Sequence, residues 1–130
     1  MYLQADILNQ KGPEVGSPEF QTALRSAQKA VSLQPGLGVG HNLLAKLYLQ
    51  TGKNREAIEE SRKALNIDPK DQTAVYHLIQ ALRKTGDKTE LPELLKRLAQ
   101  LRQEATRQEE QHNRYKLIEG NAQTSPAAQP

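Results

Sequence analysis

Three histidines are the first residues in this chain to consider for catalysis or metal binding. His77 is followed four residues later by Ala81, so the second ligand that a helical metal site needs is absent there. His112 lies among charged residues near the end of the chain, which indicates a solvated helix face. His41 occupies a packing position, where a histidine is more often a hydrogen-bonded interior residue or a subunit-facing residue than a ligand. The histidines therefore predict neither a metal site nor an acid–base pair.

The other side chains offer no catalytic arrangement either. The chain has no cysteine, which excludes a thiol nucleophile, a disulfide framework and a thiolate zinc site. It contains no G-x-S-x-G nucleophile motif, and its glycine-rich segment 36–40 follows Pro35 and a predicted helix rather than a strand. We interpret that segment as a soft turn between helices. We expect no enzyme activity, no metal and no cofactor.

Charge and hydropathy argue against two further classes of partner. The net charge is +3, and basic pairs such as Arg62 and Lys63 have acidic neighbours such as Glu59 and Glu60. That mixture favours ion pairs within helices over a track for phosphates, so we expect no nucleic-acid binding. Apolar runs such as 43–45 are far shorter than the ~20 residues that cross a bilayer, so we expect no membrane insertion.

The chain repeats itself with a period of 34 residues. A shift of that length places small residues on small ones and turn residues on turn residues: Ala23 on Ala57, Ala30 on Ala64, Pro35 on Pro69, Leu44 on Leu78 and Gly52 on Gly86. Each unit contains two apolar stripes at helical spacing, separated by a turn at 51–53 in the unit that is best preserved. In that unit the stripes are Leu43, Leu44, Leu47 and Tyr48, then Ala57, Ile58, Ser61, Ala64 and Leu65. The spacing predicts paired helices.

The unit at 38–71 resembles the tetratricopeptide repeat. The positions of its L-G-x-x-Y, alanine and proline pattern are occupied here by Leu44, Ala45, Tyr48, Gly52, Ala57, Ala64 and Pro69. The unit departs from the pattern at His41, where the repeat prefers tryptophan, and at Ser61, where it prefers an aromatic residue. Alanines let paired helices approach closely, and Pro69 ends the second helix. The resemblance implies an all-α fold: a helix-turn-helix repeat array, or α-solenoid, of about three helix pairs with an extended C-terminal helix.

The period divides the chain into three units and a tail. Residues 1–37 are an irregular first unit with an inserted loop near 11–18, after which Ser17 and Pro18 start a helix. Residues 38–71 match the family pattern, and 72–119 are a third unit whose second helix is long and has Thr89 as its N-cap. Residues 120–130 are small and polar, so we expect a flexible tail. The short first helix favours a piece of a longer array, and the compartment stays open between cytoplasm and periplasm.

The resemblance also implies where a partner binds. In such arrays the first helices of successive units line a concave groove, whose hydrogen-bonding groups and phenolic rings suit an extended peptide or a helix. The family positions that face the groove are Asn42, Lys46 and Leu49 in the middle unit, Tyr76, Gln80 and Arg83 in the third, and Tyr2, Asp6 and Asn9 in the first. Some family members bind a C-terminal carboxylate there. Here Asn42 and Lys46 stand in the reverse order, and Thr73 and His77 replace two bases, so we do not predict that clamp.

The predicted function is a non-catalytic scaffold that docks a protein or peptide in this groove. The alternative is a self-assembly module that forms a homodimer through the ends of the array or through the C-terminal helix. That helix has a row with the alternating steps of four and three of a coiled coil: Leu94, Leu98, Leu101, Ala105, Gln108, His112 and Tyr115. The apolar character fades after Ala105, so such a seam would be short.

Overall fold

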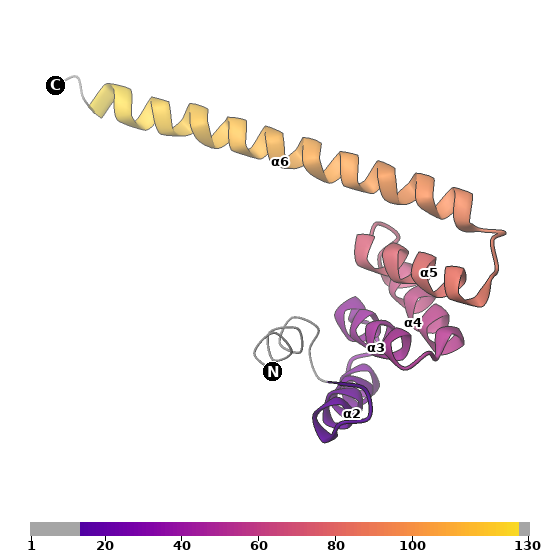
Figure 1. Cartoon of the computed structure of the whole chain (residues 1–130). Helices are drawn as coiled ribbons and strands as arrows, with labels where there is room; N and C mark the ends of the chain where they lie inside the picture. The colour runs from indigo at the N-terminus through magenta and orange to yellow at the C-terminus, as the bar shows by residue number, and fades with distance from the viewer. Residues whose placement is uncertain (1–13, 128–130) are drawn as a thin grey trace, which may run out of the picture.

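The structure is a computed structural model that describes residues 14–127, with side chains described through 119. Its helices are α2 (Pro18–Leu33), α3 (Gly38–Gln50), α4 (Asn54–Ile67), α5 (Gln72–Thr85) and α6 (Leu91–Ala127), and no strand occurs between residues 14 and 127. The predicted all-α fold is confirmed. Figure 1 shows α2 to α5 gathered into one body, from which α6 extends far outward.

The period of 34 residues recurs in the backbone geometry. α2 and α4 end alike, because the N–H groups of Gln34 and Asp68 each donate to the carbonyl four residues earlier, both at 2.9 Å. α3 and α5 also end alike, since each is followed by a glycine in the left-handed region, Gly52 at φ 78° and Gly86 at φ 82°. A residue with a side chain would be strained at either position. The matching turns make the two units structural repeats as well as sequence repeats.

Small residues at the helix contacts let the units pack closely. α4 packs against both α3 and α5, α3 also contacts α2 and α5, and α5 contacts α6. Fully buried alanines occur on three of these helices: Ala45, Ala57, Ala64, Ala74 and Ala81. Larger side chains fill the space around them, led by Phe20 and Leu44 between α2 and α3 and by Val75 and Leu78 toward α6. The core is therefore a series of contacts between neighbours, as expected for a stacked array.

The glycine-rich segment differs from the prediction. Gly38 and Gly40 lie within α3, so the prediction of a turn was wrong for these two residues, and the turn between α2 and α3 covers only 34–37. A Cβ atom on Gly40 would lie 3.1 Å from Cγ2 of Val31. This glycine therefore permits α2 and α3 to approach closely, which sequence spacing alone did not reveal.

The start of α6 is one residue later than predicted. The N–H of Leu94 donates to the carbonyl of Glu90 at 3.0 Å, so Glu90 and not Thr89 is the N-cap. Thr89 belongs to the preceding loop, where its N–H donates to Asp87 Oδ1 at 3.1 Å. Pro92 lies in the first turn, where its missing N–H costs the helix no hydrogen bond.

The end of α6 lies beyond the predicted boundary at residue 119, because the helix continues to Ala127. Once a helix has started, each further residue adds one backbone hydrogen bond, so the helix runs on until a breaker. The first proline after Pro92 is Pro126, next to the last helical residue. The separate tail predicted from residue 120 was therefore wrong for 120–127, and its flexibility stays a prediction.

The first part of α6 closes the core and the rest projects from it. Leu94 and Leu98 are buried in a cluster with residues of α5, and Leu101 packs against this cluster. From 105 to 119 every side chain is exposed. The strongest apolar positions of the predicted coiled-coil seam are thus covered by the array itself. Between residues 14 and 127, no helix combines the length and apolar character needed to cross a membrane.

Candidate functional site

α3 and α5 lie side by side and are joined near both ends. At their amino ends, Asn42 Nδ2 donates to Asp71 Oδ2 at 2.7 Å, and Asp71 Oδ1 accepts the N–H of Ala74, which caps α5. At their carboxyl ends, Lys84 Nζ donates to the Leu49 carbonyl at 3.3 Å. The two helices therefore run in the same direction and are fixed in register.

The sides of α3 and α5 that face away from α4 form one continuous surface, which we call the α3–α5 strip. α4 packs against both helices, so their buried sides point toward it. The exposed positions recur at steps of three and four around Lys46 on α3 and around Gln80 on α5, which places them on one face of each helix. The exposed or half-buried residues of the strip are Val39, Asn42, Leu43, Lys46, Gln50, Thr73, Tyr76, Gln80, Arg83 and Lys84.

Most of the predicted groove residues within the described range lie on this strip. Lys46, Tyr76 and Arg83 are exposed, whereas Asn42 and Gln80 are half-buried. Gln80 Nε2 donates to Tyr76 Oη at 3.0 Å, which holds these two side chains together. The row predicted for the first unit, Tyr2, Asp6 and Asn9, lies outside the described residues.

Leu49 and Leu43 exchange the roles predicted for them. Leu49, predicted to face the groove, is only 7% exposed and packs in a cluster with Ala57 and Ala81, so that prediction was wrong. Leu43, predicted to pack inside, is 43% exposed. α3 is contacted by α2, α4 and α5, so its buried arc is wider than one stripe and is turned toward α5. The exposed Val39 was also missed, although it lies seven residues, about two turns, before Lys46.

His77 lies at the base of the strip. The residue is 8% exposed, and its Nδ1 atom is sealed from solvent with no hydrogen-bond partner in the described part of the chain. Burial lowers the pKa of His77 below its ordinary value of 6.5; Asp71 opposes this shift and Lys46 adds to it. His77 is therefore neutral at pH 7, and the positive charge of the strip comes from its lysines and arginine.

The repeat pattern and this geometry agree with a comparison to known families. A family profile described as Tetratricopeptide repeat matches residues 17–115, from the cap of α2 into the projecting part of α6. The chain belongs to the tetratricopeptide repeat family. A search of curated proteins found no match. Tetratricopeptide repeats generally mediate protein–protein interaction and are typically non-catalytic.

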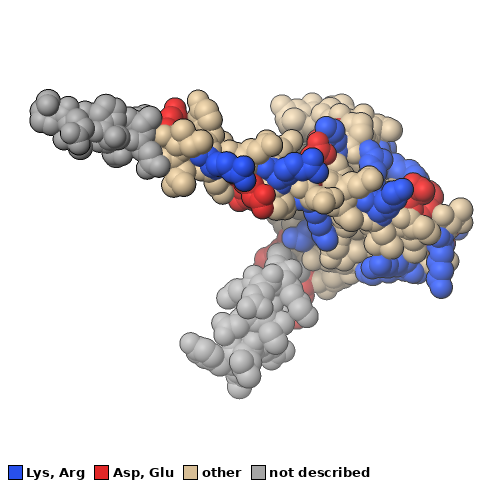
Figure 2. All heavy atoms as spheres, turned by 90° about the horizontal axis from the view of Figure 1, so that it is seen from above, with Lys and Arg blue, Asp and Glu red and all other residues tan. Residues whose placement is uncertain are grey.

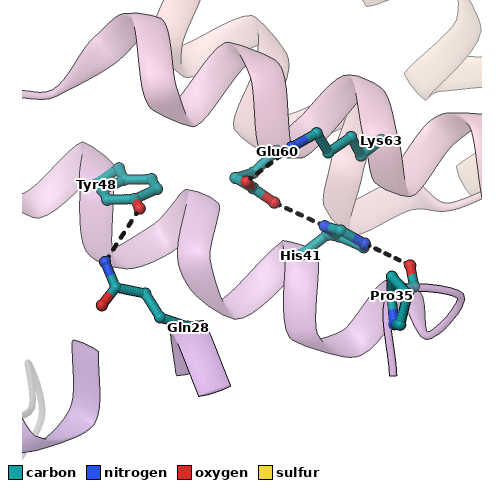
Figure 3. A network of polar contacts seen from close by, with 6 residues as sticks. All are labelled: Gln28, Pro35, His41, Tyr48, Glu60 and Lys63. Carbon is teal, nitrogen blue, oxygen red and sulfur yellow. Dashed lines mark hydrogen bonds and ion pairs between the residues drawn. The ribbon is translucent and has the colours of Figure 1, made fainter. Parts of the chain in front are cut away.

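A second polar cluster in this tetratricopeptide repeat array lies at the contact between α3 and α4 (Figure 3). His41 Nδ1 is 2.6 Å from Glu60 Oε2, and His41 Nε2 donates to the Pro35 carbonyl at 2.7 Å. Lys63 Nζ lies 3.4 Å from Glu60 Oε1. Both His41 and Glu60 are buried, at 3% and 8% exposed. Because a carbonyl only accepts, Nε2 carries a proton, and another proton joins Nδ1 to the carboxylate.

The hydrogen bonds of His41 explain how it replaces the large side chain that the family prefers. The ring is interior, as expected from the sequence, and both of its nitrogens are used within the protein. Its hydrogen bonds hold the turn after α2 to α3 and hold α3 to α4. The cluster therefore has a structural role, and neither ring nitrogen is left to act on a ligand.

No catalytic centre emerges from the rest of the described residues. Between residues 14 and 119, no group of three histidine, aspartate or glutamate side chains could hold a metal ion. Several cations are paired with acids, such as Arg62 with Glu90 at 2.6 Å and Lys70 with Glu104 at 3.5 Å. Figure 2 shows basic and acidic side chains next to each other along the described part of α6, with no unbroken basic track on that face.

Proposed function

We propose that this chain docks a segment of a partner protein on the α3–α5 strip. The observation that supports this function is that binding-competent side chains stay exposed on the strip although both helices are packed on their other sides. Tyrosine and arginine are enriched among the residues that dominate protein interfaces, and the strip offers Tyr76 and Arg83. The exposed Leu43 adds apolar area beside them.

The size of the strip suits a short segment. From Thr73 to Arg83 the axis of α5 advances by about 15 Å at ~1.5 Å per residue. That length matches four or five residues of an extended peptide at ~3.3 Å each, or about ten residues of a helix. The contact is therefore a local motif of a partner, recognised through a few side chains.

The strip is also held in place before a partner arrives. The bonds from Asn42 to Asp71 and from Lys84 to the Leu49 carbonyl fix α3 against α5 at both ends. The bond from Gln80 to Tyr76 restricts the phenol ring. A surface that is already ordered loses less conformational entropy on binding, which favours docking without a large rearrangement.

The test is a selection from a random dodecapeptide library on the immobilised protein, followed by fluorescence anisotropy with the selected peptides. Tyr76→Ala should weaken binding at least tenfold, because truncating a central aromatic contact typically costs about 2 kcal/mol or more. Tyr115→Ala is the matched control, since Tyr115 is an exposed tyrosine on the projecting part of α6.

Two results would contradict docking on the strip. Equal losses for Tyr76→Ala and Tyr115→Ala would place the contact elsewhere. A failure to select any peptide that depends on Tyr76, together with a dimer in light scattering that Tyr76→Ala dissociates, would favour the alternative of self-assembly.

A further inference from the structure

The charges of this chain are segregated between its helices. α3 and α5 contain the basic residues Lys46, Arg83 and Lys84 and no aspartate or glutamate. The whole chain has 15 acidic residues, and acids occur on each of the other described helices, for example Glu19 on α2 and Glu56 on α4. Acids are therefore absent from the two helices that form the α3–α5 strip.

The acid at the edge of the strip is already engaged. Asp71 precedes α5, and both of its carboxylate oxygens accept hydrogen bonds, from the Ala74 N–H at 3.1 Å and from Asn42 Nδ2 at 2.7 Å. Its negative charge also lies at the amino end of α5, where the helix dipole stabilises it. Asp71 therefore serves the cap and the α3–α5 contact, and it does not supply a partner for the cations farther along the strip.

The cations of the strip differ in their interaction partners within the protein. Lys84 reaches across to the Leu49 carbonyl. Lys46 and Arg83 are exposed, and neither forms an ion pair with an acid among the described residues. Exposed cations grouped on one face produce a positive potential that attracts carboxylates and steers them to that face.

The spacing of these cations limits the ligand. Asn42 contacts Asp71, and the Leu49 carbonyl contacts Lys84 at the other end of the two helices. Lys46 lies about midway between Asn42 and Leu49, so it is near the level of His77, which lies about midway between Asp71 and Lys84. Arg83 lies six residues beyond His77, about 9 Å along the helix axis. Carboxylates that contact both cations are therefore two or three residues apart in an extended segment at ~3.3 Å per residue. Leu43 lies beside Lys46 and adds an apolar contact.

We propose that the segment docked on the α3–α5 strip is an acidic peptide, in which two aspartate or glutamate residues two or three positions apart pair with Lys46 and Arg83. This inference rests on the proposed function and deepens it by naming the partner chemistry. The contact uses side-chain carboxylates within a segment, so it requires no chain terminus.

The experiment uses peptides from the selection described above, synthesised with acetylated and amidated ends so that no terminal carboxylate contributes. The selected sequences should be enriched in aspartate and glutamate relative to the library. Replacing their two acids by glutamine should weaken binding at least tenfold. Raising the NaCl concentration from ~50 to ~500 mM should weaken binding of the peptides that keep both acids.

Reversing the two charges on the protein tests the proposed pairing more directly. Lys46→Glu with Arg83→Glu should weaken binding of the acidic peptide at least tenfold and should create binding of a version that has lysines in place of the acids. The control is Lys29→Glu with Arg55→Glu, which reverses two exposed charges on α2 and α4 and changes the net charge equally. Circular dichroism of each variant checks that the helices are retained.

The outcomes separate this inference from the proposed function. Neutral peptides that depend on Tyr76 and tolerate the charge reversal would overturn the acidic ligand and leave docking intact. An equal loss in the Lys29 and Arg55 control would show attraction by net charge alone, which also overturns it. If no peptide depended on the strip at all, both proposals would fail.

Discussion

Replacing His41 and Glu60 by the residues found 34 positions later tests how this array supports a buried polar pair. His41 corresponds to Val75, and Glu60 corresponds to Leu94. Val75 and Leu94 are both buried and belong to one hydrophobic cluster. One unit thus joins its two helices through a polar contact where the next unit uses an apolar one. The double variant His41→Val with Glu60→Leu converts the first arrangement into the second.

The expected free energies of unfolding follow from burial. The Glu60 side chain is only 11% exposed, and His41→Val alone leaves its carboxylate with only Lys63, at 3.4 Å, as a partner. Removing one member of a buried pair costs about 3–5 kcal/mol, whereas replacing both by apolar residues is neutral or stabilising by about 1–4 kcal/mol. The Pro35 carbonyl loses its donor in both variants, but Pro35 is exposed, so water can replace that hydrogen bond. The double variant should therefore match or exceed the native stability.

The assay is urea denaturation followed by far-UV circular dichroism at pH 7, on the native chain, the two single variants and the double variant. The double-mutant cycle should give a coupling energy of at least about 2 kcal/mol. Lys63→Gln is the control, and because the Lys63 side chain is 55% exposed its loss should stay within about 0.5 kcal/mol. A double variant that loses as much as the two single variants together would refute the reasoning, since it would show that the pair is not coupled.

Two further predictions concern a buried histidine and a helix cap. Burial lowers the pKa of His77 below 6.5, so the unfolded chain binds a proton before the folded chain does as the pH falls. The free energy of unfolding should therefore decrease below pH 6.5 toward the folded-state pKa. In His77→Gln, the urea midpoint should change less with pH between pH 7 and pH 5.5 than it does in the native chain. An unchanged slope would mean that His77 is not buried in solution. Ser17 Oγ accepts the Phe20 N–H at 3.1 Å, so Ser17→Ala should lower the free energy of unfolding by about 1 kcal/mol while Ser17→Asp retains it. Equal stability of the Ala and Asp variants in urea would contradict this role of the cap.

The features that recur in the sequence could be predicted from it. The 34-residue shift anticipated the paired helices, the glycines after α3 and α5, and the small residues at the contacts, because each follows from a local preference or from the period. The helix start at Ser17 was likewise predicted from the residues around it, and the Ser17 hydroxyl caps that helix by accepting the Phe20 N–H. A structural feature can be predicted from the sequence where one residue and its immediate neighbours determine the geometry.

The features that depend on neighbouring helices could not be predicted in the same way. The exchange of Leu43 and Leu49 arises because α5 covers one flank of α3, which no pattern within α3 reveals. The close approach of Gly40 to Val31 likewise depends on how α2 crosses α3. The pair of His41 and Glu60 was missed although the sequence contained a signal for it. Both residues lie in the unit 38–71 and both are polar, whereas the residues 34 positions later, Val75 and Leu94, are apolar. Two polar substitutions that face each other across one contact predict a pair.

The buried pair and the α3–α5 strip can vary independently because they lie on different sides of one helix. His41 and Lys46 are five residues apart, which places them about 140° from each other around α3. His41 faces α4 and the turn after α2, whereas Lys46 is exposed on the strip. A change at His41 therefore acts through the stacking of the helices, whereas in the proposed docking a change at Lys46 acts through the charge presented to a partner. If a partner docks on the strip as proposed, a repeat array can in this way alter its ligand without altering the contacts that hold its units together, because only the outward side of the first helix in each unit then touches the partner.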